Sequence, residues 1–576
     1  MKKIYYILFF LAFFTSCDVL DSEPLDTYNE LVVWKDKGLA ENVLKEAYWS
    51  VLKNLYCSGD NNTECLRTEA WTDNVWTKDN NSVASEGISP TNVTSVAGGY
   101  NQYGLIRRTC LIIDKLTNNQ QIEAAACKQY IAEARCLRVM VYSWMARRWG
   151  GLMLVDKLMG EKDEMLLPRA TEEETYKFMV EDLKKAIPDL PLTANKERFT
   201  RGAALTLLTR VALDGGLYDE VIAAGKRLFE EGEQSALWSI DSDYRKMFGS
   251  YSYPISSKEI QFVFTLGDKK QYCEDLLAMY VAGTIAPGRN IKGPAFKEKV
   301  DAWCANWPSH DLVESYLAID VDGDGKAKPY TETAHWRNAS VKRASIMYSN
   351  RDARMDATIC RDSTIYFTSP IETNTEGNCY WENTQNHPFM SQSGYMWRKY
   401  VYEIDGAVPG YQILYDFRYI LLRLGEASLN YAEALGRKGK IEDAVKYMNM
   451  TRVAHGNLPA LPTNVSETEF WTNYKAERRS ELALEGDRYF SVIRWAKVEK
   501  ATKVPEFNTR TRSIVIEGLN SDKSNVATAG TFTVIDTPHG AGSGSDMIFS
   551  WPKRMYFPIP ESEIISNSNI KQNPQW

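Results

Sequence analysis

Two tryptophans stand close together among polar residues near the start of the chain. Trp71 and Trp76 flank Asp73 and Asn74 in the stretch TEAWTDNVWTKDNN. The flat face of a tryptophan can stack on the apolar side of a sugar ring, while fixed polar groups hydrogen-bond the hydroxyls of that ring. We therefore predict that Trp71, Asp73 and Trp76 contact a carbohydrate. The alternative is that each ring fills a small core beneath a loop.

Three more tryptophans suit the same chemistry because they lie in a region rich in Gly, Pro, Asn and Ser. Trp303 and Trp307 are four residues apart in DAWCANWPSH, and Trp336 follows in the same region. We predict that these rings extend the carbohydrate-binding surface, again with packing beneath loops as the alternative. Other tryptophans have apolar neighbours at helical spacing and are predicted to pack in the core: Trp49, Trp144, Trp149 and Trp495.

The segment DVDGDG is similar to the first half of a calcium-binding EF-hand loop. It places Asp320, Asp322 and Asp324 at positions 1, 3 and 5, and Gly325 at position 6. Position 12, where such a loop needs a bidentate glutamate, is Thr331. Two interpretations therefore stay open: a calcium site at the three aspartates, or a plain acidic turn. No other cofactor is predicted.

Known catalytic motifs are absent from the sequence, and its charge disfavours one class of partner. There is no HExxH, GxSxG or Walker motif. A glycosidase needs only two suitably spaced carboxylates, so the 75 acidic residues leave a hydrolase open on composition alone. The net charge of -7 and the pI near 5.6 argue against binding to the phosphates of nucleic acids.

The ten cysteines show no CxxC pair and no spacing typical of zinc ligands. Cys110, Cys127 and Cys136 lie in helix-like segments and are predicted to be small buried apolar residues. Loop-like segments hold two pairs of cysteines that could close short disulfides: Cys57 with Cys65, and Cys360 with Cys379.

The N-terminus is typical of a bacterial lipoprotein. Lys2 and Lys3 precede an apolar run from 4 to 14, which suits a signal peptide but is too short to span a bilayer. Thr15 and Ser16 then stand directly before Cys17, as in a lipobox. We predict a signal peptide over residues 1–16, lipidation of Cys17, and an acidic tether over residues 17–37, where several acyl chains would hold the protein firmly on a membrane.

Apolar residues recur at helical spacing in two parts of the chain. The pattern predicts helices over 38–55 and 130–151, and Thr171 with Glu174 has the spacing of a capping box. Two pairs of helices are predicted, one joined at Gly215 and Gly216 and the other between Gly436 and Gly439. Each pair has about the length of a tetratricopeptide unit.

These patterns predict a mainly α fold in which tetratricopeptide-like helix pairs form a scaffold. A single domain is expected over residues 38–576. The helical scaffold is predicted to cover about 38–240 and 417–500, while periodicity fades in two inserts of loops and a few short strands, about 241–416 and 504–551. Long loops of this kind are often the functional parts of a protein.

Several segments, in order along almost the whole chain, resemble the SusD/RagB-like outer-membrane lipoproteins of Bacteroidetes. The segments that carry the resemblance are SCDVLDSEPLD, AEARCLRVMVYSWMARRWGGLMLVD, RGAALTLLTRVAL, NRDARMDATI, LLRLGEASLNYAEAL, ERRSELALEGDRYFSVIRW and YFPIPESEIISNSNIKQNPQW. Tyr100 and Asn101 are similar to the family's binding strip, although Tyr100 stands where a tryptophan is common. The resemblance therefore adds Tyr100 and Asn101 to the predicted glycan-binding residues.

The resemblance implies a non-catalytic protein anchored by lipid in the outer membrane, facing the outside of the cell. Its implied partners are a SusC-like TonB-dependent transporter and an oligosaccharide or polysaccharide, which it captures and delivers to the transporter. The alternatives are a RagB-like peptide-binding lipoprotein, a mainly structural subunit of the transporter complex, and a surface glycoside hydrolase.

Overall fold

The structure is a computed structural model, and it describes most of the chain in eight stretches. The signal peptide, Cys17, most of the tether and Trp303 lie outside these residues. The described residues are 30–57, 64–77, 81–266, 306–382, 390–407, 416–520, 522–536 and 546–576.

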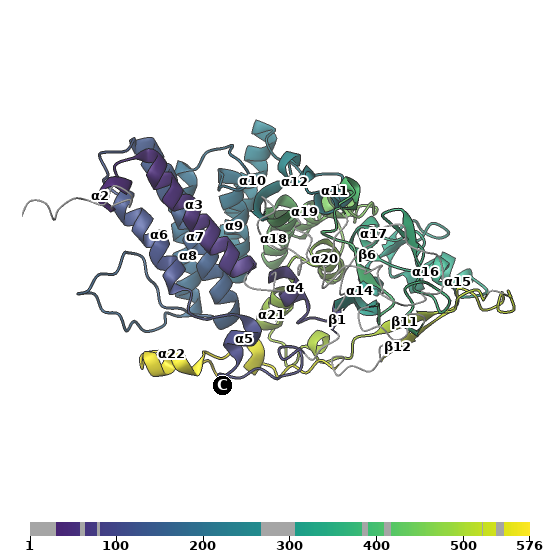
Figure 1. The fold of residues 1–576 in the computed structure, drawn as a ribbon. Helices are drawn as coiled ribbons and strands as arrows, with labels where there is room; N and C mark the ends of the chain where they lie inside the picture. The colour runs from purple at the N-terminus through teal and green to yellow at the C-terminus, as the bar shows by residue number, and fades with distance from the viewer. Residues whose placement is uncertain are drawn as a thin grey trace, which may run out of the picture.

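The N-terminal part is a layer of long helices (Figure 1). Helix α7 contacts α3, α6 and α8, and α9 packs on α8 and α10. Two short helices, α2 (Glu30–Val33) and η1 (Ile187–Asp189), accompany the long ones. The long helices are α3 (Lys37–Tyr56), α6 (Tyr103–Leu116), α7 (Ala124–Trp149), α8 (Glu172–Ala186), α9 (Arg201–Asp214) and α10 (Tyr218–Ser235).

Helix α7 is buried on almost every side and even holds charged residues inside the protein. Glu133 accepts a hydrogen bond from Tyr48 at 2.7 Å, and Arg138 binds Asp182 through Nε and Nη2 at 2.8 and 2.9 Å. These partners are necessary because a buried charge without one is costly. The predicted capping box at Thr171 and Glu174 is present at the start of α8.

A second group of helices continues the stack through the centre of the molecule. These are α18 (Leu424–Arg437), α19 (Ile441–Ala454), α20 (Glu467–Glu481) and α21 (Arg488–Val498). Helix α18 contacts α9 and α10. A Cβ on Gly225 of α10 would lie only 2.6 Å from the ring of Tyr431 on α18, so a small residue is needed where the two pairs meet.

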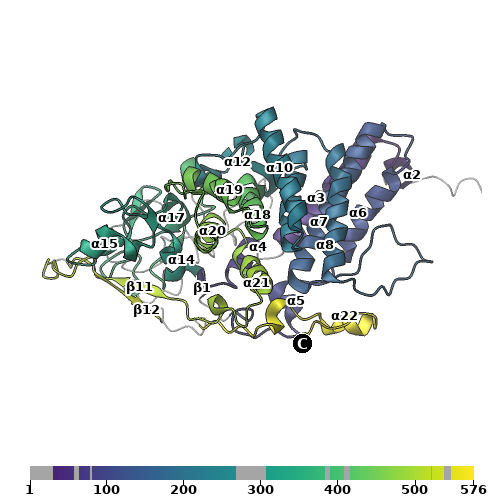
Figure 2. The same cartoon turned by 180° about the vertical axis from the view of Figure 1, so that it is seen from behind.

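Short elements fill the other end of the molecule and its lower side (Figures 1 and 2). Each strand pairs with one antiparallel partner: β1 with β3, β2 with β10, β4 with β5, β6 with β9, β7 with β8, and β11 with β12. The strands are β1 (Val75–Thr77), β2 (Ile260–Leu266), β3 (Asn306–Pro308), β4 (Ala318–Ile319), β5 (Ala327–Lys328), β6 (Ile359–Cys360), β7 (Thr364–Tyr366), β8 (Ser369–Ile371), β9 (Met396–Trp397), β10 (Phe417–Arg423), β11 (Ser513–Ile516) and β12 (Phe532–Ile535).

Short helices connect these strands and the C-terminal segment. The C-terminal segment runs back to the N-terminal layer, where Trp149 Nε1 donates to the carbonyl of Pro558 at 3.0 Å. The short helices are α4 (Glu64–Glu69), α5 (Val93–Ala97), α11 (Tyr244–Gly249), α12 (Tyr253–Ser256), α14 (His310–Ser315), η2 (Tyr330–Glu332), α15 (Ala334–Asn338), α16 (Ala344–Met347), α17 (Ala353–Thr358), η4 (Glu403–Asp405), η5 (Pro505–Phe507), η6 (Lys553–Met555) and α22 (Glu561–Ser566).

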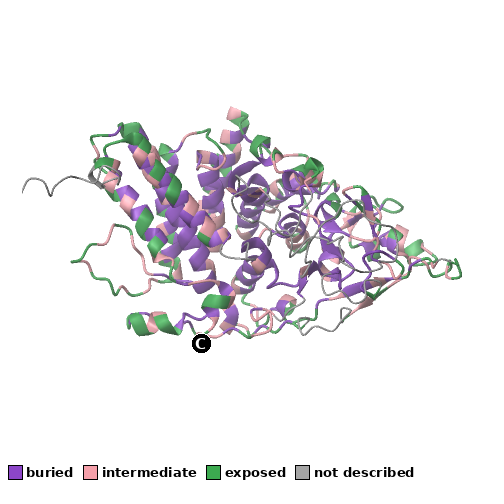
Figure 3. Cartoon of the chain, in the orientation of Figure 1, coloured by how far each residue is buried: buried purple, intermediate pink, exposed green. Residues whose placement is uncertain are grey.

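The mainly α fold with stacked helix pairs is confirmed. Buried residues run continuously through the helical layers and thin out toward the tips of the loops (Figure 3). None of the described helices combines the length and the apolar character needed to cross a lipid bilayer.

The cysteine predictions have mixed outcomes. Cys110, Cys127 and Cys136 are buried on α6 and α7, as predicted. Cys360 is a buried free thiol, so the disulfide suggested between Cys360 and Cys379 is not formed.

Candidate functional site

An open groove lies along one face of helix α20. Two adjoining hollows of about 420 and 540 Å³ form it. They are one continuous groove because the two hollows share six lining residues: Asp73, Glu314, Ser315, Pro329, Arg479 and Glu506.

Helix α20 supplies one wall of the groove through residues at helical spacing. Thr472, Lys475, Ala476 and Arg479 lie three or four positions apart and face the larger hollow. The opposite wall comes from α14 and from Lys328 and the residues that follow strand β5. The groove therefore joins segments that are far apart in the sequence.

Asp73 lines both hollows of the groove and binds two arginines. Its carboxylate accepts hydrogen bonds from Arg488 Nε and Nη2, both at 3.0 Å, and Arg479 Nη2 lies 2.9 Å from Asp73 Oδ2. Burial disfavours an ionised carboxylate, but these guanidinium groups outweigh it and lower the pKa of Asp73. Asp73 is therefore an ionised carboxylate at neutral pH.

A second layer of residues fixes the orientation of Arg479. Arg479 Nε donates to Asn74 Oδ1 at 2.7 Å, and Asn74 Nδ2 donates to Glu69 Oε1 at 2.6 Å. Glu69 is completely buried, and burial raises its pKa to about 7. The short segment from Glu69 to Asn74 thus positions an arginine that belongs to a helix distant in sequence.

The opposite wall is also held together by charge pairs. Arg512 donates to Asp311 at 2.7 Å through Nε and to Glu314 at 2.5 Å through Nη2. Burial opposes ionisation of Glu314, but His310 and Arg512 lower its pKa to about 2. This wall therefore presents fixed, ionised groups to the groove.

The acidic loop that suggested calcium binding instead holds a lysine. Lys328 Nζ lies 2.9 Å from both Asp320 Oδ2 and Asp324 Oδ1, and His335 Nδ1 lies 2.6 Å from Asp322 Oδ2. An ammonium group between two of the aspartates fills the place of a cation, and no bidentate carboxylate completes the loop. The geometry favours the acidic turn, and the calcium site at the three aspartates stays a prediction.

Three of the tryptophans predicted to bind a glycan, Trp71, Trp76 and Trp307, lie in the core. Trp76 and Trp307 are 1% and 0% exposed and stack on each other with ring centroids 4.8 Å apart. They meet because β1 and β3 pair with these two residues directly opposite. Trp71 is 2% exposed and packs edge-on against Tyr489 and Phe557.

Tyr100 is also buried, with its ring edge-on to Trp149 at 5.3 Å. The predicted platform is thus corrected for Trp71, Trp76, Tyr100 and Trp307, because none of these rings has a free face. In the part of the chain that the structure describes, every Trp, Tyr or Phe ring is buried or only partly exposed.

The remaining predicted residues stay predictions. Asn101 is exposed, and its Nδ2 lies 3.5 Å from Glu563 Oε2. Trp336 is partly exposed and packs against Tyr330 and Phe532. Of the predicted glycan-binding residues that the structure describes, Asp73 alone lines the groove.

Apart from Asp73, the charged residues of the groove were not predicted from the sequence as binding residues. Lys475 and Arg479 had a detectable signal, because they are four residues apart and share one face of a helix. Glu506 and Arg512 had no such signal in the sequence, because their position depends on how an irregular segment packs beside α14.

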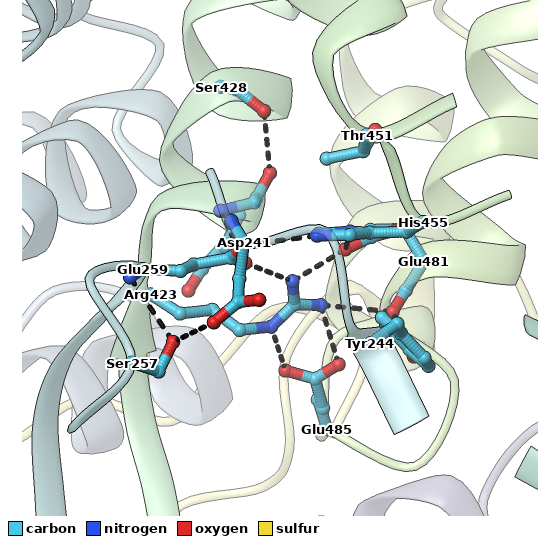
Figure 4. A network of polar contacts seen from close by, with 12 residues as sticks. Asp241, Tyr244, Ser257, Glu259, Arg423, Ser428, Thr451, His455, Glu481 and Glu485 are labelled. Atoms are coloured by element: carbon cyan, nitrogen blue, oxygen red, sulfur yellow. Dashed lines mark hydrogen bonds and ion pairs between the residues drawn. The ribbon is translucent and has the colours of Figure 1, made fainter. Parts of the chain in front are cut away.

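The other side of α20 faces a buried ionic network (Figure 4). Arg423 binds Glu485 through Nε and Nη2, both at 2.7 Å, and Arg423 Nη1 lies 3.0 Å from Glu259 and 2.5 Å from Glu481. His455 bridges Glu481 at 2.8 Å and Glu259 at 3.0 Å through its two ring nitrogens. Every member of this network is shielded from water or nearly so.

The ligand atoms of Glu259, His455 and Glu481 lie close enough together to hold a metal ion. Burial disfavours a charged imidazole, but the two carboxylates outweigh it and raise the pKa of His455 to about 10. Both ring nitrogens then carry protons and donate to the carboxylates, so neither is available to a metal. The cluster is an internal ion-pair network.

Two protein-family models match most of the chain. Residues 282–576 match the model of the SusD family, and residues 24–213 match a family described as starch-binding and associating with the outer membrane. The chain belongs to the SusD family.

Its relatives are distant in sequence but similar in fold. A SusD-like protein of Bacteroides ovatus is 22% identical over 494 residues, which cover 83% of this chain and 80% of that protein. A SusD-like protein of Bacteroides fragilis superposes with a TM-score of 0.73 at 23% identity, over 96% of this chain and all of that one. A SusD-like carbohydrate-binding protein of the same species has a TM-score of 0.67 at 20% identity, over 94% of this chain and all of that one.

Proposed function

We propose that this protein is a non-catalytic lipoprotein of the cell surface that captures an oligosaccharide or polysaccharide. In this proposal it passes the glycan to a TonB-dependent transporter of the outer membrane. Membership of the SusD family supports the proposal, since one matching family is described as starch-binding and a similar structure is named as a carbohydrate-binding protein. The lipobox-like segment before Cys17 supports the anchor, and mass spectrometry of the mature N-terminus would test it.

The groove along α20 is the binding site in this proposal, and its geometry is the observation that carries it. The two hollows of about 420 and 540 Å³ adjoin each other through their shared lining residues and are open to solvent, so together they offer room for more than one sugar unit. Their walls offer guanidinium and ammonium donors beside carboxylate acceptors, and each sugar hydroxyl can both donate and accept.

The charge states of two carboxylates in the groove, Asp73 and Glu314, support binding without catalysis. A glycoside hydrolase needs a protonated carboxylic acid at neutral pH, which requires a raised pKa. The pKa values of Asp73 and Glu314 are lowered instead, by their arginine and histidine partners. Neither residue is suited to act as the general acid.

Weak affinity is sufficient for capture if a transporter performs the uptake step. A dissociation constant between micromolar and millimolar corresponds to about -8 to -4 kcal/mol. A few hydrogen bonds from fixed charged groups contribute on that scale, at about 1.5 to 3 kcal/mol each.

Removal of Arg479 tests the site. Arg479→Ala deletes a donor that lines both hollows, and we expect it to weaken retention by at least about tenfold, the loss of one charged hydrogen bond. Native affinity electrophoresis through a gel containing starch or another neutral glycan measures this. Arg107, an exposed arginine on α6, provides the matched control as Arg107→Ala.

Unchanged retention by the folded Arg479→Ala variant would remove the groove from the proposal. Release of shorter sugars by the pure protein would overturn its non-catalytic part. Retention of peptides but of no polysaccharide would favour the peptide-binding alternative.

A further inference from the structure

We infer that the groove along α20 selects an uncharged glycan and excludes acidic polysaccharides. This inference rests on the proposed function and adds the chemical class of the ligand. It depends on how the charges that line the groove are paired.

Each cation that lines the groove already has a carboxylate partner. Arg479 and Arg488 share Asp73. Arg512 is bound to Asp311 and Glu314, as described above, and Lys475 Nζ lies 3.0 Å from Glu499 Oε2. An acidic sugar would therefore find no lining cation whose charge is not already compensated by a carboxylate of the protein.

Lys328 is also paired with carboxylates, since it lies between Asp320 and Asp324. Its two partners also restrain the ammonium group at the rim of the larger hollow. A mobile lysine could swing toward a ligand's carboxylate, but this one would first have to break two ion pairs.

The groove carries no excess of unpaired positive charge. Five cations line it: Lys328, Lys475, Arg479, Arg488 and Arg512. Four carboxylates line it with them, Asp73, Asp311, Glu314 and Glu506, and three more bind its lysines: Asp320, Asp324 and Glu499, of which Glu499 also pairs with Arg437. Charges balanced in this way give the groove no strong positive field to attract a polyanion.

Glu506 gives the groove an acceptor for sugar hydroxyls. It lines both hollows, and its carboxylate has no hydrogen bond or ion pair with the residues that the structure describes. An ionised carboxylate accepts only, so it suits the O–H donors of a neutral sugar and disfavours another carboxylate.

Arg488 supplies donors beside this acceptor. Its bonds to Asp73 use Nε and Nη2, so within the described residues its Nη1 group keeps its two N–H donors for a ligand oxygen. Arg488 and Glu506 line the same hollow, so a donor and an acceptor are both available there to the hydroxyls of one glycan. The site therefore recognises the polyol character of a glycan rather than a net charge.

The test compares polysaccharides of different charge with the full-length lipidated protein in detergent. Affinity gels contain neutral polysaccharides (starch, laminarin, galactomannan), acidic ones (polygalacturonate, alginate) or cationic chitosan. We expect retention by at least one neutral polysaccharide and by neither acidic one. Retention should change less than about twofold when the salt concentration rises tenfold, since salt screens only charge-dependent binding.

Variants of Glu506 assign the selectivity to the groove. Glu506→Ala should weaken retention by about fivefold or more, whereas Glu506→Gln keeps an acceptor oxygen and should lose less. Glu233→Ala, at an exposed position on α10, is the matched control. A Glu506→Ala variant that is folded, as judged by circular dichroism, and binds normally would overturn the inference.

The other outcomes separate this inference from the proposed function. Retention by an acidic polysaccharide, or by chitosan alone, would overturn the selectivity but keep a glycan-binding protein. Absence of retention by every polysaccharide would overturn both.

Discussion

Helix α20 has two charged faces that differ in their access to water. Glu477 and Glu481 point into the buried network, where Arg354 and Arg423 bind them. Lys475 and Arg479, on the other face, line the open groove. Both faces are rich in ion pairs, yet one can stabilise only the fold whereas the other can also meet a ligand.

The difference shows that an ion pair by itself does not indicate a binding site. A buried pair is costly to form and still more costly to break, because removal of one partner leaves a charge without water or a counter-ion. A solvent-exposed pair contributes little to stability. Substitutions on the two faces should therefore have separable effects, with loss of stability on the buried face and loss of binding on the open face.

Removal of Arg423 should have the largest effect. Arg423→Met would leave the carboxylates of Glu259, Glu481 and Glu485 without their central partner, and we expect a loss of about 3–5 kcal/mol in the free energy of unfolding. Chemical denaturation followed by tryptophan fluorescence measures it. The control is Arg227→Ala, which breaks an exposed pair with Glu231 and should cost at most about 0.5 kcal/mol.

If both variants lost similar amounts of stability, the distinction between buried and exposed ion pairs would not hold for this protein. A variant with Arg423→Met that keeps wild-type stability would show that the network is not needed for the fold.

The pH dependence of stability provides the next test of the buried face. The pKa of His455 is raised from about 6.5 to about 10 in the folded state, so folding favours its protonated form. Its stabilising contribution is present in full below pH 6.5 and is lost as the pH rises toward 10. We expect the free energy of unfolding to fall by about 2–4 kcal/mol between pH 6.5 and pH 9.5.

His455→Gln identifies the source of this pH dependence. Glutamine cannot gain a proton in this range, so the variant should be less stable at pH 6.5 and should show a shallower slope up to pH 9.5. Equilibrium denaturation at a series of pH values gives both quantities. An unchanged slope would assign the effect to another group.

The sequence predicted the elements that depend on local patterns. The helices around α3 and α7, the capping box at Thr171 and the breaks between paired helices follow from periodicity, caps and glycines. The short helices between 241 and 416 were not predicted, because four to six residues are too few to show a helical period.

The binding residues were harder to predict because tertiary contacts decide their exposure. Trp76 and Trp307 each stand in a polar stretch, but the pairing of β1 with β3 stacks one ring on the other and buries both. Asp73 was selected as a hydrogen-bonding neighbour of those rings. It lies in the groove for a different reason, namely its ion pairs with Arg479 and Arg488 from the far end of the chain.

Glu69 links the buried network and the groove, and its substitution has the smallest expected effect of those considered. It is buried like the network, yet it supports Arg479 of the groove through Asn74. The charged or titratable groups around it are Lys399, Arg479, Arg488, Asp487 and Tyr316. Because burial raises its pKa to about 7, the folded protein favours its protonated form, and stability is lost as the pH rises from 4.5 through 7.

Glu69→Gln should therefore stabilise the protein at pH 8 by about 1–3 kcal/mol and leave it nearly unchanged at pH 4.5. Glutamine keeps an acceptor oxygen for Asn74, so Arg479 should stay in place and retention of a neutral glycan should stay within about twofold of the wild type. Glu69→Ala removes that acceptor, and we expect it to weaken retention. If Glu69→Gln weakened retention as much as Glu69→Ala, the charge of Glu69 would be what positions Arg479. The groove and the interior would then be coupled by electrostatics instead of by the hydrogen bonds through Asn74.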